Sequence, residues 1–141
     1  MAFRITDKCV GCAVCRKICP VACIDGAPRK VHRVDANRCI DCGACGRVCP
    51  HEAVIDADGR AARRIRFRRT WEQPVISREH CISCNICIDA CPTACLSLDY
   101  TTGTEATWVY PILSDARACI ACGFCAVDCP VEAITMVKPE L

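Results

Sequence analysis

The chain has 141 residues, of which 18 are cysteine and only 5% are aromatic, and its formal net charge is +2 at pH 7. This length allows one ordinary domain or two very small ones, and the shortage of large side chains argues against a conventional aromatic core. The N-terminus lacks the pattern of a secretion signal, and no apolar run approaches the roughly 18 residues of a spanning helix. We therefore expect a cytoplasmic protein without direct membrane insertion, in which the thiols bind metal and do not form disulfides.

The first 58 residues begin and end with short β-forming segments, at residues 2–6 and 53–58, which we expect to pair. Between these segments the pattern C-x2-C-x2-C-x3-C-P occurs twice. A short helical turn is expected between the third and fourth cysteines of a copy, as in residues 15–19. The first copy comprises Cys9, Cys12, Cys15 and Cys19, and the second comprises Cys39, Cys42, Cys45 and Cys49.

An arginine-rich segment follows at residues 59–73, and its alternating side chains predict an extended connector with Ile65 and Phe67 on one face. It would be either a solvated linker or a docking segment for an acidic protein partner. Arginines beside aromatic rings also suit nucleic acid, but one short run gives little support, and we expect no nucleic-acid partner. The candidate docking residues are Arg63, Arg64, Arg66, Arg68 and Arg69.

Residues 74–141 repeat the organisation of residues 1–58, with β-forming segments at residues 74–77 and 133–137. The third and fourth copies of the cysteine pattern lie between them. The first motif of each half is offset by 72 residues and the second by 80, so the chain consists of two modules. The third copy comprises Cys81, Cys84, Cys87 and Cys91, and the fourth comprises Cys119, Cys122, Cys125 and Cys129.

The additional eight residues of the second module lie within residues 96–115. Their β-forming residues flank Thr102-Gly103, which predicts a longer hairpin that turns at this pair. Trp108 and Tyr110 in this segment would either pack on the module or face a partner, and packing is the favoured interpretation.

The cysteine run is typical of cubane iron–sulfur sites, and it resembles the bacterial dicluster ferredoxin family, in two tandem copies as in a polyferredoxin. Zinc ribbons separate their cysteine pairs by longer loops, so the tight runs favour iron–sulfur over zinc. The resemblance implies an α+β fold of short strands, short helices and much loop around four [4Fe–4S] clusters. It also implies crossed ligation, in which the fourth thiolate of each motif binds the cluster of the neighbouring motif. The four ligand sets would be Cys9, Cys12, Cys15 and Cys49; Cys39, Cys42, Cys45 and Cys19; Cys81, Cys84, Cys87 and Cys129; and Cys119, Cys122, Cys125 and Cys91.

Two cysteines fall outside these sets. Cys23 and Cys95 each follow a Cys-Pro cysteine by four residues, where the second and fourth motifs carry Ala53 and Ala133. A small apolar residue is therefore sufficient there, which favours a non-ligand thiol packed near a cluster, as the family resemblance also implies. A reserve ligand, a disulfide and another redox role stay open as alternatives.

The residue after the second cysteine of each motif is Ala13, Gly43, Asn85 or Gly123. Glycine and asparagine tolerate a positive φ, so these loops are expected to contain left-handed backbone. Ala13 departs from this pattern, so the first loop is expected to be either shaped differently or strained. A requirement for small residues near a crowded cluster would explain the same four positions.

The charge is divided unevenly along the chain. Residues 1–72 hold 15 Lys and Arg against 8 Asp and Glu, giving +7, and residues 73–141 hold 3 against 8, giving −5. An oxidised cluster with its four thiolates adds about −2, so two clusters per module lead to about +3 and −9. We therefore expect the clusters of the first module to be reduced first.

Nothing in the sequence resembles a substrate site, and His32, His51 and His80 have no recurring acidic or serine partner. We expect no catalysis by the chain alone, and electron transfer as a relay subunit of a larger anaerobic oxidoreductase, with redox proteins as partners. A free, diffusible polyferredoxin is a close alternative. A redox or oxygen sensor is a distant one, because a sensor ordinarily needs an effector domain for which this length leaves no room.

Overall fold

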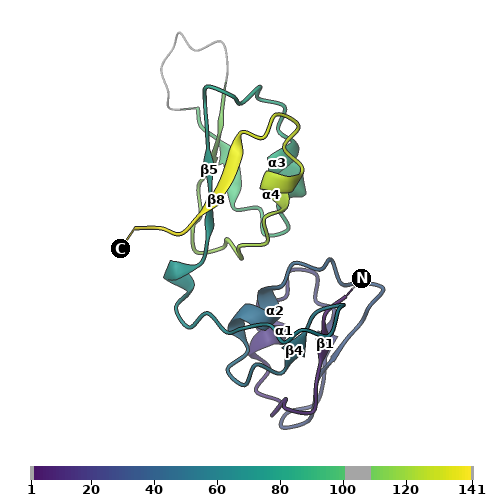
Figure 1. Cartoon of the computed structure of the whole chain (residues 1–141). Helices are drawn as coiled ribbons and strands as arrows, with labels where there is room; N and C mark the ends of the chain where they lie inside the picture. The colour runs from purple at the N-terminus through teal and green to yellow at the C-terminus, as the bar shows by residue number, and fades with distance from the viewer. Residues whose placement is uncertain (1, 101–108, 141) are drawn as a thin grey trace. The chain divides into compact units, whose positions relative to one another are not determined.

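The computed structural model of the chain describes residues 2–100 and 109–140. Contacts between Cα atoms divide it into two compact units, Met1–Arg68 and Arg69–Leu141, which are coloured along the chain in Figure 1. The boundary falls inside the segment 59–73 that the sequence predicts as a connector. The greater part of that segment therefore belongs to the first unit.

The first unit contains two small antiparallel sheets. In the first sheet β1 (Arg4–Ile5) pairs with β4 (Val54–Ile55), which confirms the predicted pairing of the two ends of the module. In the second sheet β2 (Ile24–Asp25) pairs with β3 (Arg33–Val34). The two helices, which pack against each other, are α1 (Val14–Ile18) and α2 (Ala44–Val48).

The second unit repeats this arrangement. Its terminal strands β5 (Gln73–Ile76) and β8 (Ile134–Val137) run side by side, and β6 (Leu96–Leu98) pairs with β7 (Pro111–Leu113) (Figure 1). The helices are α3 (Ile86–Ala90) and α4 (Phe124–Val127), and a 3-10 turn, η1 (Arg68–Thr70), spans the boundary between the units.

The pairing of β6 with β7 confirms the predicted hairpin, although its expected turn at Thr102-Gly103 and Trp108 lie outside the described residues. Tyr110 lies under the guanidinium of Arg78, with 5.4 Å from Cζ to the ring centroid. This contact agrees with the packing interpretation of Tyr110, since the ring is engaged by its own unit.

The helices are short because the motif limits them at both ends. Each begins after a residue with left-handed φ, and three of the four end at the cysteine before the motif's proline, which takes an extended conformation, as at Cys19 with φ −63° and ψ 118°. A residue before proline is disfavoured in the helical region, so the helix stops there and the chain turns away. Within residues 2–100 and 109–140, no helix has the length and apolar character needed to cross a bilayer.

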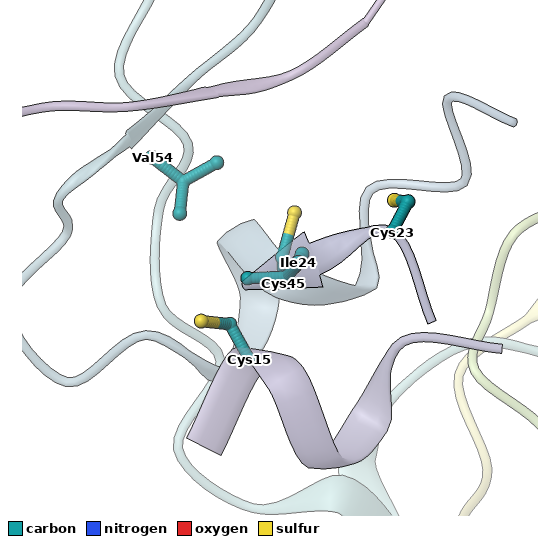
Figure 2. Close-up of a cluster of buried hydrophobic side chains, with 5 residues drawn as sticks. All are labelled: Cys15, Cys23, Ile24, Cys45 and Val54. Atoms are coloured by element: carbon teal, nitrogen blue, oxygen red, sulfur yellow. The ribbon is translucent and has the colours of Figure 1, made fainter. Parts of the chain in front are cut away.

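Thiols occupy much of the buried cluster in each unit. Figure 2 shows the core of the first unit, in which three of the five buried residues are cysteine: Cys15, Cys23, Ile24, Cys45 and Val54. The second unit has the equivalent set of Cys87, Cys95, Leu96, Cys125 and Ile134. Few aliphatic side chains are buried in these two clusters, so cysteine side chains fill a large share of the interior.

The arginine-rich segment is attached to the first unit by its backbone. The N–H of Ile65 donates to the carbonyl of Arg47 at 2.9 Å. A Cβ on Gly46 would lie 2.4 Å from Cβ of Ala62, so only glycine in α2 allows the segment to approach this closely. Ile65 and Phe67 are 39% and 51% exposed, so they do not form the buried face of an alternating strand. The segment is therefore an anchored surface strip with exposed side chains, and not a free linker.

Candidate metal centres

Two cavities in the first unit are lined by cysteine thiols drawn from both of its motifs. The first cavity, of about 330 Å³ including space open to solvent, collects Cys9, Cys12, Cys15 and Cys49. The second cavity, of about 310 Å³, collects Cys19, Cys39, Cys42 and Cys45, together with Cys23. In each case three thiols come from one motif and the fourth from the Cys-Pro position of the other.

The second unit repeats this arrangement in two further cavities. The third cavity, of about 310 Å³, collects Cys81, Cys84, Cys87 and Cys129. The fourth cavity, of about 290 Å³, collects Cys91, Cys119, Cys122 and Cys125, together with Cys95. The structure therefore brings together the sixteen thiols in the sets that crossed ligation would require. Ligation of iron by these sets stays a prediction.

The packed helices explain why each cavity draws on two motifs. The third cysteine of each motif lies on a helix, as Figure 2 shows for Cys15 on α1 and Cys45 on α2, whose sulfur atoms point in different directions. The Cys-Pro bond then turns the fourth cysteine away from its own helix. Because α1 packs on α2 and α3 on α4, the fourth thiol reaches the cavity of the neighbouring motif.

Backbone N–H groups point at the sulfur atoms from two recurring positions. The N–H two residues after a first cysteine donates to its Sγ at 3.4 Å, from Gly11, Asp41 and Ser83. The N–H four residues after a Cys-Pro cysteine donates to its Sγ at 3.2–3.4 Å, from Cys23, Ala53, Cys95 and Ala133. Such bonds stabilise a thiolate and the negative charge of a bound cluster.

Left-handed backbone recurs at three positions of every motif, which aims these N–H groups. One position follows the first cysteine by two residues, one directly follows the second cysteine, and one follows the Cys-Pro cysteine by three. Glycine occupies only three of the twelve positions, Gly11, Gly43 and Gly123; the others are Ala13, Ala22, Asp41, Glu52, Ser83, Asn85, Ala94, Ala121 and Glu132. At roughly 1–2 kcal/mol each, the nine non-glycine residues are a large unfavourable sum for a small unit.

Ala13 has the same conformation as its three counterparts. Its φ of 64° compares with 76° at Gly43, 65° at Asn85 and 76° at Gly123. Of the two alternatives expected for the first loop, a different shape is therefore wrong, and strain is what the structure contains. Small size alone is also an incomplete explanation, since the shared feature is the backbone angle.

The third cysteine of each motif is the most buried of its set. Burial raises the pKa of Cys15 to about 11, of Cys45 to about 12 and of Cys125 to about 11, and it also raises the pKa of Cys87. Without a bound cation these thiols remain protonated at neutral pH. Metal binding must therefore displace a proton from each, which couples assembly of the site to proton release.

Cys23 and Cys95 lie beside the fourth cysteine of their own motifs. The Sγ of Cys23 is 3.5 Å from that of Cys19, and the Sγ of Cys95 is 3.4 Å from that of Cys91. Burial raises the pKa of both Cys23 and Cys95 to about 12, so each is a neutral thiol that lines a cavity. This is the position expected of a packed thiol, and their role as non-ligands stays a prediction.

Cys91 differs in its environment from the equivalent cysteines. Burial opposes its ionisation, but the hydroxyl of Thr93, 3.6 Å from Cys91 Sγ, and the N–H and thiol of Cys95 lower its pKa. The first unit has Val21 at the position of Thr93, so the hydroxyl is specific to the fourth cavity. Sequence reasoning missed this contact, although the CPVAC and CPTAC segments differ at that residue.

Buried polar atoms without a partner occur in the third motif. Among the described residues, Ser83 Oγ and Asn85 Oδ1 are buried without a hydrogen-bond partner, and Asn85 lines the cavity. In that same part of the chain, no three His, Cys, Asp or Glu side chains converge on a single ion. Four thiols around a cavity, with backbone N–H groups beside them, instead suit a [4Fe–4S] cluster, whose four irons each take one thiolate.

The three histidines have separate environments. His51 lines the first cavity, the Nδ1 of His80 lies 2.9 Å from Ser77 Oγ, and His32 is buried. None of these contacts joins a histidine to an acidic side chain, so the structure adds no hydrolytic constellation to the cysteine sites. The arginines proposed for docking are all exposed, and none of them lines any of the four cavities.

Comparisons with known proteins agree with this geometry. The family model of the 4Fe-4S dicluster domain matches the chain three times, at residues 8–53, 38–95 and 80–133. The middle match joins the second motif of the first unit to the third motif, so it reflects the even repetition of the motif along the chain.

Similar proteins include subunits of several oxidoreductases. Pyruvate synthase subunit PorD of Methanothermobacter marburgensis is 42% identical over 72 residues, 51% of this chain and 73% of its own. The polyferredoxin-like subunit of an aliphatic sulfonate oxidoreductase from Pyrococcus furiosus is 32% identical over 127 residues, 88% of this chain and 50% of its own. NADH-quinone oxidoreductase subunit I of Pelobacter propionicus is 36% identical over 62 residues, 41% of this chain and 33% of its own. The chain thus spans half or less of the length of the last two.

The repeated motif, the two similar units and the family matches all lead to the same assignment. Because the matches together extend from residue 8 to residue 133, this chain belongs to the 4Fe-4S dicluster domain family.

Proposed function

We propose that this chain is a non-catalytic electron-relay subunit of a larger oxidoreductase, carrying four [4Fe–4S] clusters. The support is the set of four cavities, each lined by four thiols from two motifs. Of the relatives named above, two are called subunits of oxidoreductases and one a subunit of pyruvate synthase. We place the relay in a reducing compartment such as the cytoplasm, because cysteine sets of this kind bind metal there and do not form disulfides.

When bound, a [4Fe–4S] cluster supplies a one-electron couple. The chain's own part is to hold four thiolates around each cavity and to set the energy of an added electron. Backbone N–H groups at Gly11, Cys23, Ala53 and the equivalent positions favour additional negative charge, whereas burial of the third cysteines opposes it. These two effects differ between cavities, so the four sites are expected to have different reduction potentials.

The anchored arginine strip, residues Arg63, Arg64, Arg66, Arg68 and Arg69, is our proposed attachment point for the rest of the complex. All five side chains are exposed. The backbone N–H of Arg64 donates to Glu52 Oε1, and that of Ile65 donates to the carbonyl of Arg47, so this part of the strip is held on the first unit before binding. A positive strip on a fixed backbone suits an acidic surface on a stable protein partner.

Anaerobic native mass spectrometry of the protein from its source, prepared in gentle salt, tests this function. We expect the 141-residue chain to occur in a larger assembly and to carry the mass of four clusters. A lone chain with four clusters would identify a diffusible carrier instead of a relay subunit. A chain that carries zinc, or fewer than four clusters, would contradict the proposed ligand sets.

A further inference from the structure

The two exposed cysteines of the chain line the first and third cavities. Cys12 and Cys84, the second cysteines of the first and third motifs, are exposed, whereas their counterparts in the second and fourth motifs are half-buried. The residue after the first cysteine follows the same division. Val10 is 48% exposed and Ile82 is 47% exposed, but the equivalent Ile120 is 3% exposed. Because electron tunnelling weakens steeply with distance, an exposed opening is where a second protein can approach closely enough.

Basic side chains outnumber the one neighbouring acid, the exposed Asp7, around the first cysteine motif. Lys8 is exposed and directly precedes Cys9. The N–H of Arg29 donates to the carbonyl of Gly11 at 3.3 Å, and a Cβ on Gly11 would lie 2.4 Å from the backbone nitrogen of Lys30. Arg29 and Lys30, both exposed, are therefore seated against the loop that lies between the first two cysteines.

The loop that carries these two basic residues is fixed by a buried histidine. His32 is 1% exposed, and its Nδ1 donates to the carbonyl of Lys30 at 2.9 Å. A Cβ on Gly26 would lie 2.6 Å from Cγ of His32, so the ring packs against bare glycine backbone. Val31, which stands between Lys30 and His32 in the sequence, is 47% exposed. The surface around the opening is thus held in one shape before any partner binds, which reduces the entropy cost of docking.

Among the described residues, the third motif has a similar exposed apolar residue, Ile82, but a different set of charges. Glu79 and Asp89 of this motif are exposed; Glu79 has its equivalent in Asp7, whereas Asp89 stands where the first unit has Lys17. The nearby cation Arg78 is paired with Asp99, with 2.9 Å between Nη2 and Oδ2. The basic character is therefore found at the first motif and not at the described residues of the third.

We propose that the opening of the first cavity is the docking surface for an acidic one-electron carrier protein. This basic port is formed by Lys8, Val10, Arg29, Lys30 and Val31 around the exposed Cys12. The apolar side chains supply contact area, and the three cations select an acidic surface and steer it to the thiol. The reduced carrier would give up one electron and this protein would gain it, with no bond made or broken. The proposal rests on the proposed function and deepens it, because the arginine strip would hold the complex while the basic port exchanges electrons.

The test uses the full chain with its clusters bound and flavodoxin as the acidic probe. Binding of oxidised flavodoxin is measured by calorimetry at low and high salt, and stopped flow measures electron transfer from flavodoxin hydroquinone. We expect Lys8→Glu with Lys30→Glu to weaken binding and slow transfer about tenfold at low salt, and to remove most of the salt dependence. Arg117→Glu with Lys138→Glu makes the same change in net charge in the second unit, and should leave both quantities nearly unchanged.

Each of the following outcomes would contradict the basic port as the docking surface. One is equal weakening by both double variants, which would indicate a response to net charge alone. Another is loss of binding in Arg64→Glu with Arg66→Glu while the Lys8/Lys30 variant binds normally, which would place docking at the arginine strip. Reduction by dithionite separates this proposal from the proposed function. A wild-type protein that dithionite cannot reduce would contradict electron relay itself, whereas a reducible protein without the charge effect would contradict only the port.

Discussion

Ala13→Gly and Gly123→Ala should change stability in opposite directions. Both residues directly follow the second cysteine of a motif, and both have left-handed backbone, with φ of 64° and 76°. Glycine adopts this conformation without penalty, whereas a residue with a Cβ does not. The two substitutions therefore exchange the strained and unstrained versions of one loop.

The expected magnitude follows from three contributions. A left-handed residue with a Cβ costs about 1–2 kcal/mol, and the greater freedom of glycine in the unfolded chain offsets about 0.5–1 kcal/mol of this. A Cβ on Gly123 would meet Met136 Cγ at 4.0 Å, an ordinary contact that adds no clash. Gly123→Ala should thus cost about 0.5–1 kcal/mol. Ala13→Gly should gain about 0.5 kcal/mol, because loss of the half-buried methyl group removes part of the benefit.

Anaerobic thermal unfolding of the protein with clusters bound, followed by cluster absorbance, measures this effect. For a domain of this size 1 kcal/mol corresponds to about 4–8 °C in Tm. We expect Ala13→Gly to raise the Tm of the first unit by roughly 2–4 °C and Gly123→Ala to lower that of the second by roughly 2–8 °C. Shifts of the same sign, or a higher Tm for Gly123→Ala, would refute the assignment of strain to these loops.

Three further predictions concern the clusters. Cys23→Ala and Cys95→Ala should each leave the cluster content unchanged, because the fully buried Ala53 fills the equivalent position of the second motif. Iron and sulfide analysis measures the cluster content, and the loss of a cluster would instead support ligation by these cysteines. Thr93→Val should lower the reduction potential of the fourth cluster by about 20–60 mV, which is the one-electron equivalent of a hydrogen bond worth about 0.5–1.5 kcal/mol. Val21→Thr should raise the reduction potential of the second cluster. Potentiometric titration followed by electron paramagnetic resonance measures both, and unchanged potentials would show that the hydroxyl has no influence. The clusters of the first unit should be reduced before those of the second, because the units carry about +3 and −9 with clusters bound; the reverse order in proteins with one unit disabled would contradict this electrostatic argument.

The cysteine pattern predicted most of the fold and the grouping of the thiols. Its spacing limits each helix to one turn, and the proline after the fourth cysteine redirects that thiol towards the neighbouring motif. The terminal strands followed from β-forming residues at the ends of each repeat, and β1 with β4 and β5 with β8 confirm them. The structure of a repeated motif can be predicted reliably because every copy imposes the same local backbone conformation.

The features that the sequence did not predict depend on contacts between distant residues. The arginine strip alternates like an exposed strand, yet it is anchored because Gly46 leaves room for Ala62, which no local pattern indicates. Ala13 does not favour left-handed backbone, and the surrounding loop imposes it. The hydrogen bond from Thr93 to Cys91 depends on side-chain direction. Each of these is a case in which tertiary packing overrides or supplements local preference.

The exchange of fourth cysteines has a consequence for the order of events during synthesis of the chain. The second cavity of the first unit has all its thiols only when Cys45 has been synthesised, and the first cavity only when Cys49 has, although Cys9 to Cys15 appear much earlier. Both cavities of that unit are then completed by a single short stretch, before any residue of the last motif exists. In the second unit Cys125 completes the fourth cavity and Cys129 completes the third. Clusters could therefore be inserted into the first unit before the second unit has been synthesised. A nascent chain that stalls inside a unit would present the iron–sulfur assembly machinery with two incomplete sites at once.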